Sequence, residues 1–221
     1  MRISVEVRWF GAGGIPPDVD AWFRDPGSSF AWSAGGGRTR TDSYLSLGSP
    51  ELGIKRRGGG SGCEIKGLVG VMPRGCRFGH AEVFPRIFSK WSVEALDSSD
   101  MPSVRVEKTR WLRLFAMMPE PREMRLGAGE MREDPVEAGR LPEIGCGVEV
   151  TGIEVDGEEW WTFAAEAFAR PGEGLAIDLV AESLTVVLRR LSEHATVDLR
   201  SATYQGYAEW LVARGFTDPV A

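Results

Sequence analysis

The sequence predicts an α+β domain made mainly of antiparallel β-strands, with helices packed against them. Three observations support this fold class. The 221 residues include 28 glycines and 13 prolines, which suits many short strands joined by turns. The clearest local patterns alternate every two residues. Strand patterns come first and helical patterns last, without the regular alternation of a doubly wound sheet. The length fits one hydrophobic core, so we expect a single domain over residues 1–221.

In residues 2–69, alternation of apolar and polar residues predicts strands, and stretches rich in glycine predict turns and loops. Residues 2–10 alternate strictly, with Ile3, Val5, Val7 and Trp9 on one side, and predict a strand. Residues 11–44 are rich in Gly, Pro and Ser and predict mostly loop, with a short helix at 18–24. Residues 52–57 and 63–69 predict a hairpin whose tip is the glycine run 58–62. That run lacks the Gly-Lys-Ser/Thr ending of a P-loop, so it favours a plain turn.

The second half of the chain predicts both helices and strands. Residues 82–96 predict a helix because Val83, Ile87, Trp91 and Ala95 recur at every fourth position, and Pro85 limits where it can start. Residues 104–115 predict a strand. The charged residues 117–142, interrupted by Pro and Gly, favour a long surface excursion or a lid. Residues 148–168 predict a hairpin, and residues 175–191 and 204–214 predict two helices, the last ending at Gly215.

The turn at Asp156 and Gly157 fixes a register for the hairpin of residues 148–168. A two-residue loop places Val155 opposite Glu158 and Thr151 opposite Thr162. One face then carries Glu149, Thr151, Thr162 and Glu166, while the other is apolar. Glu149 and Glu166 become diagonal neighbours, roughly 7–8 Å apart at the backbone, so both carboxylates can approach one cation.

Pairs of charged residues share a face on most of the other predicted strands. These pairs are Glu6 and Arg8, Lys55 and Arg57, Glu64 and Lys66, and Lys108 and Arg110. The last pair has the same parity as Val104, Val106 and Leu112, which requires a bulge or an end-of-strand position. A sheet with one solvated face gives this pattern. So does a closed barrel whose charged faces point inward and whose apolar faces lie outward beneath the two late helices.

At these positions the sequence resembles the CYTH superfamily, also called the triphosphate tunnel metalloenzymes. The similar stretches follow one another in the expected order at 4–8, 52–57, 64–66, 108–110, 148–168 and 207–211. The resemblance implies a closed eight-stranded antiparallel barrel with flanking helices and a charged tunnel. It also implies hydrolysis of a triphosphate, which in this family is inorganic triphosphate, thiamine triphosphate, an RNA end or a nucleoside triphosphate.

The resemblance further implies roles for individual residues. The phosphate chain would be bound by Arg8, Lys55, Arg57, Lys66, Lys108 and Arg110. Of these, Lys108 and Arg110 would act in catalysis. A divalent cation, Mg²⁺ or Mn²⁺, would be held by Glu6, Glu64, Glu149 and Glu166. Such cations prefer oxygen ligands and lower the pKa of a bound water, which supplies a nucleophile.

The chain departs from the family pattern in its opening motif. The family has Glu-x-Glu-x-Lys, whereas this chain has Ser4, Glu6 and Arg8. One carboxylate is therefore missing, and an arginine replaces a lysine with different hydrogen-bonding geometry. Two alternatives to a triphosphatase stay open. One is a degenerate relative that binds a polyphosphate or nucleotide without cleaving it. The other is a lipocalin-like barrel for an apolar ligand, which predicts an apolar lumen.

Composition limits the classes of binding partner and the cellular location that we expect. A net charge of −6 argues against a DNA-binding protein that works through a broad basic surface. Cys63, Cys76 and Cys146 form no Cys-x-x-Cys pair, which disfavours zinc and a disulfide framework. The start lacks a signal-peptide pattern, and no apolar run is long enough for a membrane span, so we expect a cytoplasmic protein. The tryptophans at 9, 91, 160, 161 and 210 favour packing roles.

Overall fold

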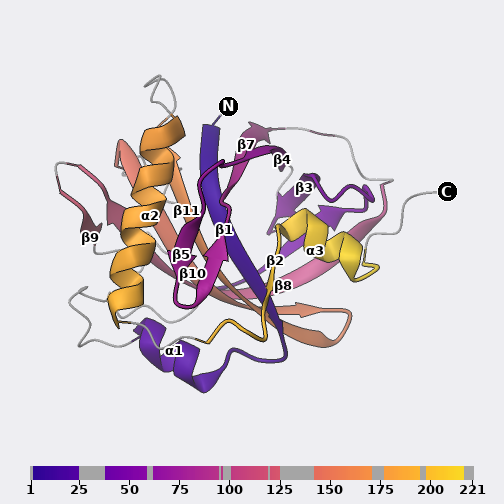
Figure 1. Cartoon of the computed structure of the whole chain (residues 1–221). Helices are drawn as coiled ribbons and strands as arrows, with labels where there is room; N and C mark the ends of the chain where they lie inside the picture. The colour runs from indigo at the N-terminus through magenta and orange to yellow at the C-terminus, as the bar shows by residue number, and fades with distance from the viewer. Residues whose placement is uncertain are drawn as a thin grey trace.

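A computed structural model describes residues 2–24, 38–58, 62–94, 96, 101–118, 120–124, 142–170, 177–194 and 198–216. Figure 1 shows its elements in chain order. The strands are β1 (Arg2–Ala12), β2 (Arg38–Leu45), β3 (Leu52–Arg57), β4 (Cys63–Val71), β5 (Cys76–Phe78), β6 (Ala81–Val83), β7 (Arg86–Val93), β8 (Ser103–Ala116), β9 (Arg122–Met124), β10 (Ile144–Val155), β11 (Glu158–Ala169) and β12 (Thr203–Tyr204). The helices are α1 (Pro17–Arg24), α2 (Ile177–His194) and α3 (Tyr207–Ala213).

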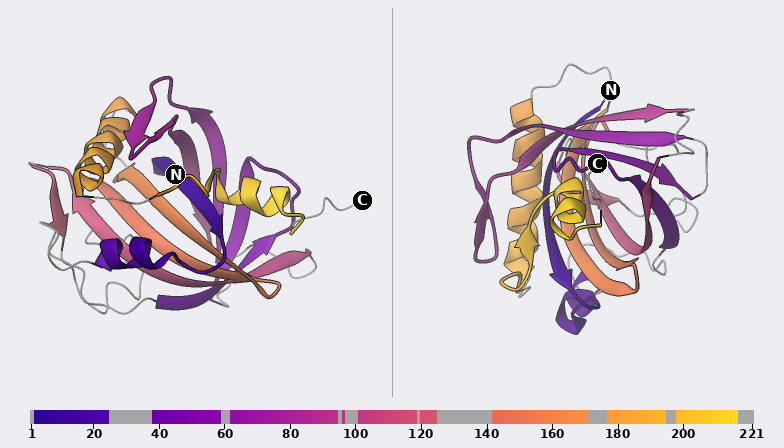
Figure 2. Two further views of the ribbon diagram at one scale, coloured as in Figure 1. Left: turned by 60° about the horizontal axis from the view of Figure 1, so that its bottom comes forward. Right: turned by 90° about the vertical axis from the view of Figure 1, so that its right-hand side faces the viewer.

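Eight antiparallel strands close into a barrel, as the sequence predicts. Their order is β10-β11-β1-β7-β4-β3-β2-β8, and β8 pairs with β10 to complete the circle. Strands β9 and β12 extend the sheet at β8 and β1, and β5 and β6 form a separate small hairpin. Closure leaves the eight strands with two faces, one outside and one lining the interior (Figure 2).

The main hydrophobic core lies outside the barrel, beneath α2. Several outward side chains of β1, β10 and β11, such as Val5, Val148 and Phe163, are fully buried. Leu184 and Leu188 of α2 pack against them, and the helix runs along this side of the sheet (Figure 1). The expected apolar cover from this late helix is therefore confirmed. Because the apolar faces of these strands are used outside, their charged faces point inward.

Helix α3 takes a different place from the expected one. It fills one end of the barrel rather than covering the outside. Its fully buried Trp210 stacks on the lumen-facing Phe10 with ring centroids 4.7 Å apart, and Val106 joins the same cluster. The register of β8 continues without a shift through Val106, Lys108 and Leu112, so its apolar residues lie toward the two ends of the interior. The end-of-strand explanation is thus confirmed, and no bulge is needed.

The hairpin β10–β11 has the predicted register. Val155 pairs with Glu158, and Thr151 pairs with Thr162. Asp156 and Gly157 both adopt positive φ, 51° and 79°, which is the backbone of a type I′ turn and matches the twist of the flanking strands.

Two predictions of secondary structure are wrong as well. Residues 82–96 do not form a helix, because residues 86–93 form β7 and pair with both β1 and β4. Residues 38–45, predicted as loop, form β2 between β3 and β8. Other predictions hold, including α1 and the β3–β4 hairpin. The end of α3 is as predicted, with Gly215 at φ 71° just after it, but the helix begins at Tyr207 rather than Tyr204, because Thr203 and Tyr204 form β12 against β1. Three parts of these predictions lie outside the described residues: the hairpin tip at 59–61, most of the excursion or lid (125–141), and the first two residues of the helix predicted over 175–191.

Candidate functional site

A cavity of about 490 Å³ lies inside the barrel. All ten site residues predicted from the sequence line it, although they come from six different strands. They are Glu6, Arg8, Lys55, Arg57, Glu64, Lys66, Lys108, Arg110, Glu149 and Glu166. The convergence follows from strand parity, because residues two apart on a strand share a face and the outer faces hold the core.

One group of ion pairs forms around Glu149, on β1, β8 and β10. Arg8 lies between two carboxylates, with Nε 3.0 Å from Glu6 Oε1 and a terminal nitrogen 2.8 Å from Glu149 Oε1. The same guanidinium donates to the Thr162 hydroxyl at 3.2 Å. Arg110 approaches the other oxygen of Glu149 at 3.6 Å. Glu149 is therefore held between two arginines.

Two lysines extend this group toward β4 and β7. Lys66 forms an ion pair with Glu6 and lies 3.7 Å from Glu166 Oε1. Lys90 forms an ion pair with the same Glu166 oxygen. Glu6 and Glu166 thus have different nearest cations but share Lys66.

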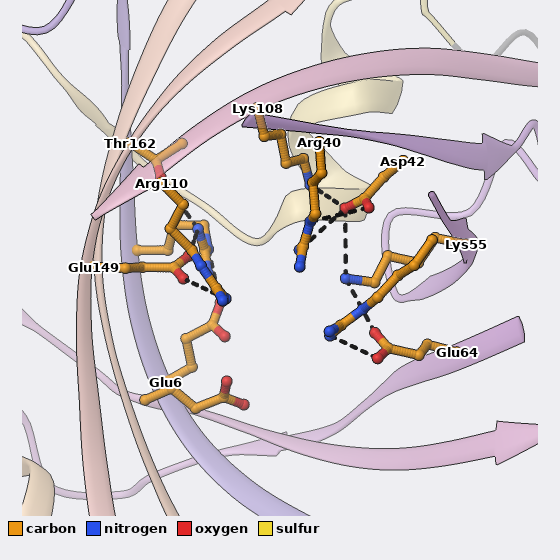
Figure 3. A network of polar contacts seen from close by, with 12 residues as sticks. Glu6, Arg40, Asp42, Lys55, Glu64, Lys108, Arg110, Glu149 and Thr162 are labelled. Carbon is orange, nitrogen blue, oxygen red and sulfur yellow. Dashed lines mark hydrogen bonds and ion pairs between the residues drawn. The ribbon is translucent and has the colours of Figure 1, made fainter. Parts of the chain in front are cut away.

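A second group lies on β2, β3, β4 and β8. Asp42 is fully buried and forms ion pairs with Arg40 and Lys108, each at 3.1 Å, while Lys55 lies 3.8 Å away. Lys55 and Arg57 also bind Glu64, at 3.0 and 2.6 Å. Figure 3 shows the two groups facing each other, one around Glu149 and the other around Asp42 and Glu64.

Lys108 is the most enclosed cation of the second group. Its ammonium donates to the Tyr44 hydroxyl at 2.6 Å and lies 3.9 Å from the centroid of the Tyr207 ring. Tyr44 and Tyr207 stack on each other with centroids 4.8 Å apart. Burial drives the pKa of Lys108 well below its usual value, although Asp42 acts in the opposite direction.

The carboxylates stay ionised despite their burial. Burial by itself would raise the pKa of Glu149, but Arg8 and Arg110 outweigh it and hold the value at about 2. Burial is likewise outweighed at Glu166, where Lys66 and Lys90 hold the pKa well below its usual value. Lys55 is shifted the other way, to about 8, because burial and the neighbouring Arg57 disfavour its charged form. These shifts mark a site where charges have been taken out of water at some cost.

Positive charge predominates in the cavity. Nine of the described residues that line it are Lys or Arg, and five are Glu. The whole chain has the opposite balance, with 26 basic and 32 acidic residues. Cations arrive from β1, β2, β3, β4, β7 and β8, so they surround the space rather than forming one basic stripe. Chemically, such an arrangement can bind a compact polyanion through several charge-assisted hydrogen bonds at once.

The four predicted metal ligands are brought into one cavity but not to one point. Glu64 lies with Lys55 and Arg57 in the second group, apart from Glu6 and Glu149 (Figure 3). Within the described part of the chain, no three Asp, Glu, His or Cys side chains gather closely enough to hold a metal ion. The donor atoms fit Mg²⁺ or Mn²⁺ by type, since they are carboxylate oxygens. Among the four, Glu6 and Glu166 are directly opposed on the neighbouring strands β1 and β11.

Sequence reasoning missed four charged residues and two tyrosines of this site. The missed charges are Arg2, Arg40, Asp42 and Lys90. Arg40, Asp42 and Tyr44 lie two residues apart on β2 and so share one face, but the sequence predicts loop in this segment. Arg2 has the parity of Glu6 and Arg8 and was available from the first strand. Lys90 was hidden by the predicted helix at 82–96, and Tyr207 was read only as part of a closing helix.

Comparison of the chain with protein-family models gives no match, and comparison with curated proteins gives none either. No described helix is both long enough and apolar enough to cross a membrane. The assignment of a function therefore depends on the geometry and charge of the cavity.

Proposed function

We propose that the barrel cavity binds the phosphate chain of a triphosphate-containing compound. The observation that carries this proposal is the ring of nine Lys and Arg side chains around a cavity of about 490 Å³ in a chain of net charge −6. Buried cations are costly unless something compensates them. An internal cluster that exceeds its carboxylate partners is the arrangement expected for an anionic ligand. The resemblance to the triphosphate tunnel metalloenzymes points to the same ligand class.

The carboxylates of the cavity act as exchangeable partners in this proposal. Glu6, Glu64, Glu149 and Glu166 each form an ion pair with a Lys or Arg, as in the pairs Arg8–Glu149 and Lys55–Glu64. A phosphate chain offers more acceptor oxygens and more negative charge than a single carboxylate, so it competes for the same donors. Arginine can bind a phosphate through two parallel hydrogen bonds, whereas lysine acts as a point charge. We assign phosphate binding to Arg8, Lys55, Arg57, Lys66, Lys108 and Arg110, and add Arg40 and Lys90 to that set.

A second candidate function is hydrolysis of the bound triphosphate with Mg²⁺ or Mn²⁺. The observation in its favour is that Glu6 and Glu166 are opposed on β1 and β11 and share Lys66. When a phosphate chain draws Lys66 away, two carboxylates face the same space and fit one divalent cation. That cation would supply charge neutralisation and an activated water. The missing acid at Ser4, which is fully buried beside this pair, favours binding over catalysis.

The proposal is tested by titrating the protein with inorganic triphosphate in a calorimeter, without metal. Native protein is expected to bind, and Lys108→Ala is expected to weaken binding by about tenfold or more, because a charge-assisted contact in a buried site is lost. The matched control is Arg105→Ala. This residue lies on the same strand and carries the same charge, but it faces outward and its side chain is 72% exposed. Equal losses in both variants would point to general electrostatics and overturn the assignment.

Hydrolysis is tested separately by phosphate release from inorganic triphosphate, thiamine triphosphate and ATP with Mg²⁺ or Mn²⁺. Turnover that is lost in Glu166→Ala and Lys108→Ala supports the enzyme. Tight metal-independent binding without release supports the binding protein. An absence of both binding and turnover for all three compounds contradicts the proposed function.

A further inference from the structure

The cavity has an apolar part that the ion-pair groups do not use. Beyond Arg110 on β8, the next lumen-facing residues are Leu112 and Leu114, and beyond Glu166 on β11 the next is Phe168. Phe88 of β7 lines the same cavity. Leu114 and Phe168 are buried in a small cluster of their own, which Leu112 joins. A purely inorganic ligand makes no use of such a surface.

The aromatic rings lie where the apolar part meets the charges. The Lys66 ammonium is 4.2 Å from the centroid of the Phe88 ring. The Arg2 guanidinium carbon is 5.6 Å from the centroid of the Phe168 ring. The cationic and apolar parts are therefore contiguous, and one ligand can contact both.

A glycine keeps the apolar part open. Gly147 faces the lumen on β10, between Leu114 on one neighbouring strand and Glu166 on the other. A Cβ placed there would meet only Leu112 Cδ1 within 4 Å, at 3.6 Å, so space adjoins this position. At Gly145, two residues earlier, a Cβ would come within 2.6 Å of the Phe168 ring. Gly147 therefore borders free volume, whereas Gly145 must lack a side chain to leave room for the Phe168 ring.

The apolar part of the cavity has few side chains that could form hydrogen bonds with a polar group of a ligand. The chain has no asparagine and a single glutamine, Gln205, so amide recognition of a base edge is almost unavailable. Among the described lining residues the uncharged polar side chains are Tyr44, Ser92, Thr151 and Tyr207. Tyr44 already receives a hydrogen bond from Lys108, and Thr151 lies level with Arg110 in the pairing of β8 and β10. A cavity of about 490 Å³ falls in the range of about 300–1,000 Å³ typical of sites for organic ligands.

The geometry points to an amphiphilic phosphate ester as the ligand: an oligophosphate head in the charged part and a hydrocarbon group against Leu112, Leu114 and Phe168. This inference rests on the proposed function, because it takes phosphate binding as given, and it adds the class of organic group. Burial of the hydrocarbon supplies affinity in proportion to the area removed from water. Selectivity over nucleotides follows because the apolar part cannot satisfy the hydrogen-bonding groups of a base.

The test is a calorimetric series that holds the phosphate number constant. Inorganic diphosphate, dimethylallyl diphosphate and geranyl diphosphate are titrated into the native protein, with inorganic triphosphate and ATP alongside. Geranyl diphosphate is expected to bind about tenfold or more tightly than inorganic diphosphate, with dimethylallyl diphosphate between them. ATP is expected to bind no more tightly than inorganic triphosphate. Equal affinities along the diphosphate series, or a clear preference for ATP, would overturn the inference.

Two variants locate the hydrocarbon group. Gly147→Leu fills the free volume, and Leu112→Ser removes apolar surface. Each is expected to reduce the preference for geranyl over inorganic diphosphate by about tenfold, measured as the ratio of the two Kd values. An unchanged ratio in both variants contradicts the assigned place. Failure of the underlying function is distinguishable, since native protein would then bind neither inorganic triphosphate nor any diphosphate.

Discussion

Glu6 on β1 and Glu166 on β11 occupy directly opposed positions in the antiparallel pairing of their strands, and Lys66 contacts the carboxylates of both. Two like charges so close in a buried site would repel each other without a cation between them. Lys66 therefore stabilises the wall of the cavity as well as offering a contact to a ligand.

Replacing Lys66 with methionine is expected to destabilise the protein by about 3 kcal/mol, because it leaves two neighbouring buried carboxylates with less compensation. The free energy of unfolding from urea denaturation at pH 7 measures the loss. The double variant Lys66→Met with Glu166→Gln should recover part of it, since one of the two acids has been neutralised. No recovery in the double variant would mean that repulsion between Glu6 and Glu166 is not the cause.

The affinity for inorganic triphosphate is expected to fall as the pH rises from 7 to 9. The pKa of Lys55 in the folded protein is about 8, lowered from 10.5 by burial and by Arg57, so its positive charge is present below pH 8 and lost above it. Calorimetric titrations at several pH values measure the change. Lys55→Arg keeps its charge throughout this range, so it should lack the step near pH 8. Parallel profiles for the two proteins would exclude Lys55 as the titrating group.

Acid is expected to remove a stabilising contribution of Glu149. Its pKa is about 2 in the folded protein against an ordinary value of 4.5, so its contribution is complete above pH 4.5 and disappears as the pH falls toward 2. Glu149→Gln should therefore cost about 3 kcal/mol at pH 7 and progressively less below pH 4.5. Denaturation of both proteins from pH 7 to pH 2.5 gives the difference. A constant difference across that range would show that charge is not responsible.

The cluster around Trp210 is expected to be a major source of stability. Trp210 is fully buried and packs on Phe10 and on Trp160. Trp210→Ala should lower the free energy of unfolding by about 3–5 kcal/mol, because a large cavity is left. The matched control is Trp91→Ala, since Trp91 is 39% exposed and should cost clearly less. Similar losses at the two positions would mean that α3 is not firmly packed in the barrel end.

The hairpin β10–β11 could be predicted to the residue because local chemistry determines it. A two-residue Asp-Gly turn allows one pairing, and a shift by one residue would turn Phe163 and Ala165 out of the core. The same parity rule placed each charged pair on one face of its strand, while the inward direction of that face depends on closure of the barrel. All ten predicted site residues line the cavity for this reason.

The missed elements depended on tertiary contacts. Apolar residues at 83, 87 and 91 fit a helical period. Residues 86–93 nevertheless form a strand, because they lie between β1 and β4 and pair with both. Strand β2 has no apolar alternation, because one face carries Arg40, Asp42 and Tyr44 into the cavity and the other carries Thr39, Thr41 and Ser43. The sequence of α3 alone could not show that this helix fills the barrel end, because Trp210 packs against residues from several strands.

The cavity and the chain as a whole have opposite charge balances, which on the proposed function would favour short anions over long ones. The residues outside the cavity lining carry the acidic excess of the sequence, and such an excess would oppose the approach of a nucleic acid polymer. An anion short enough to enter the cavity would meet a positive potential instead, and salt screens buried charges less than exposed ones. On the proposed function, discrimination between long and short polyanions would follow from where the charges lie.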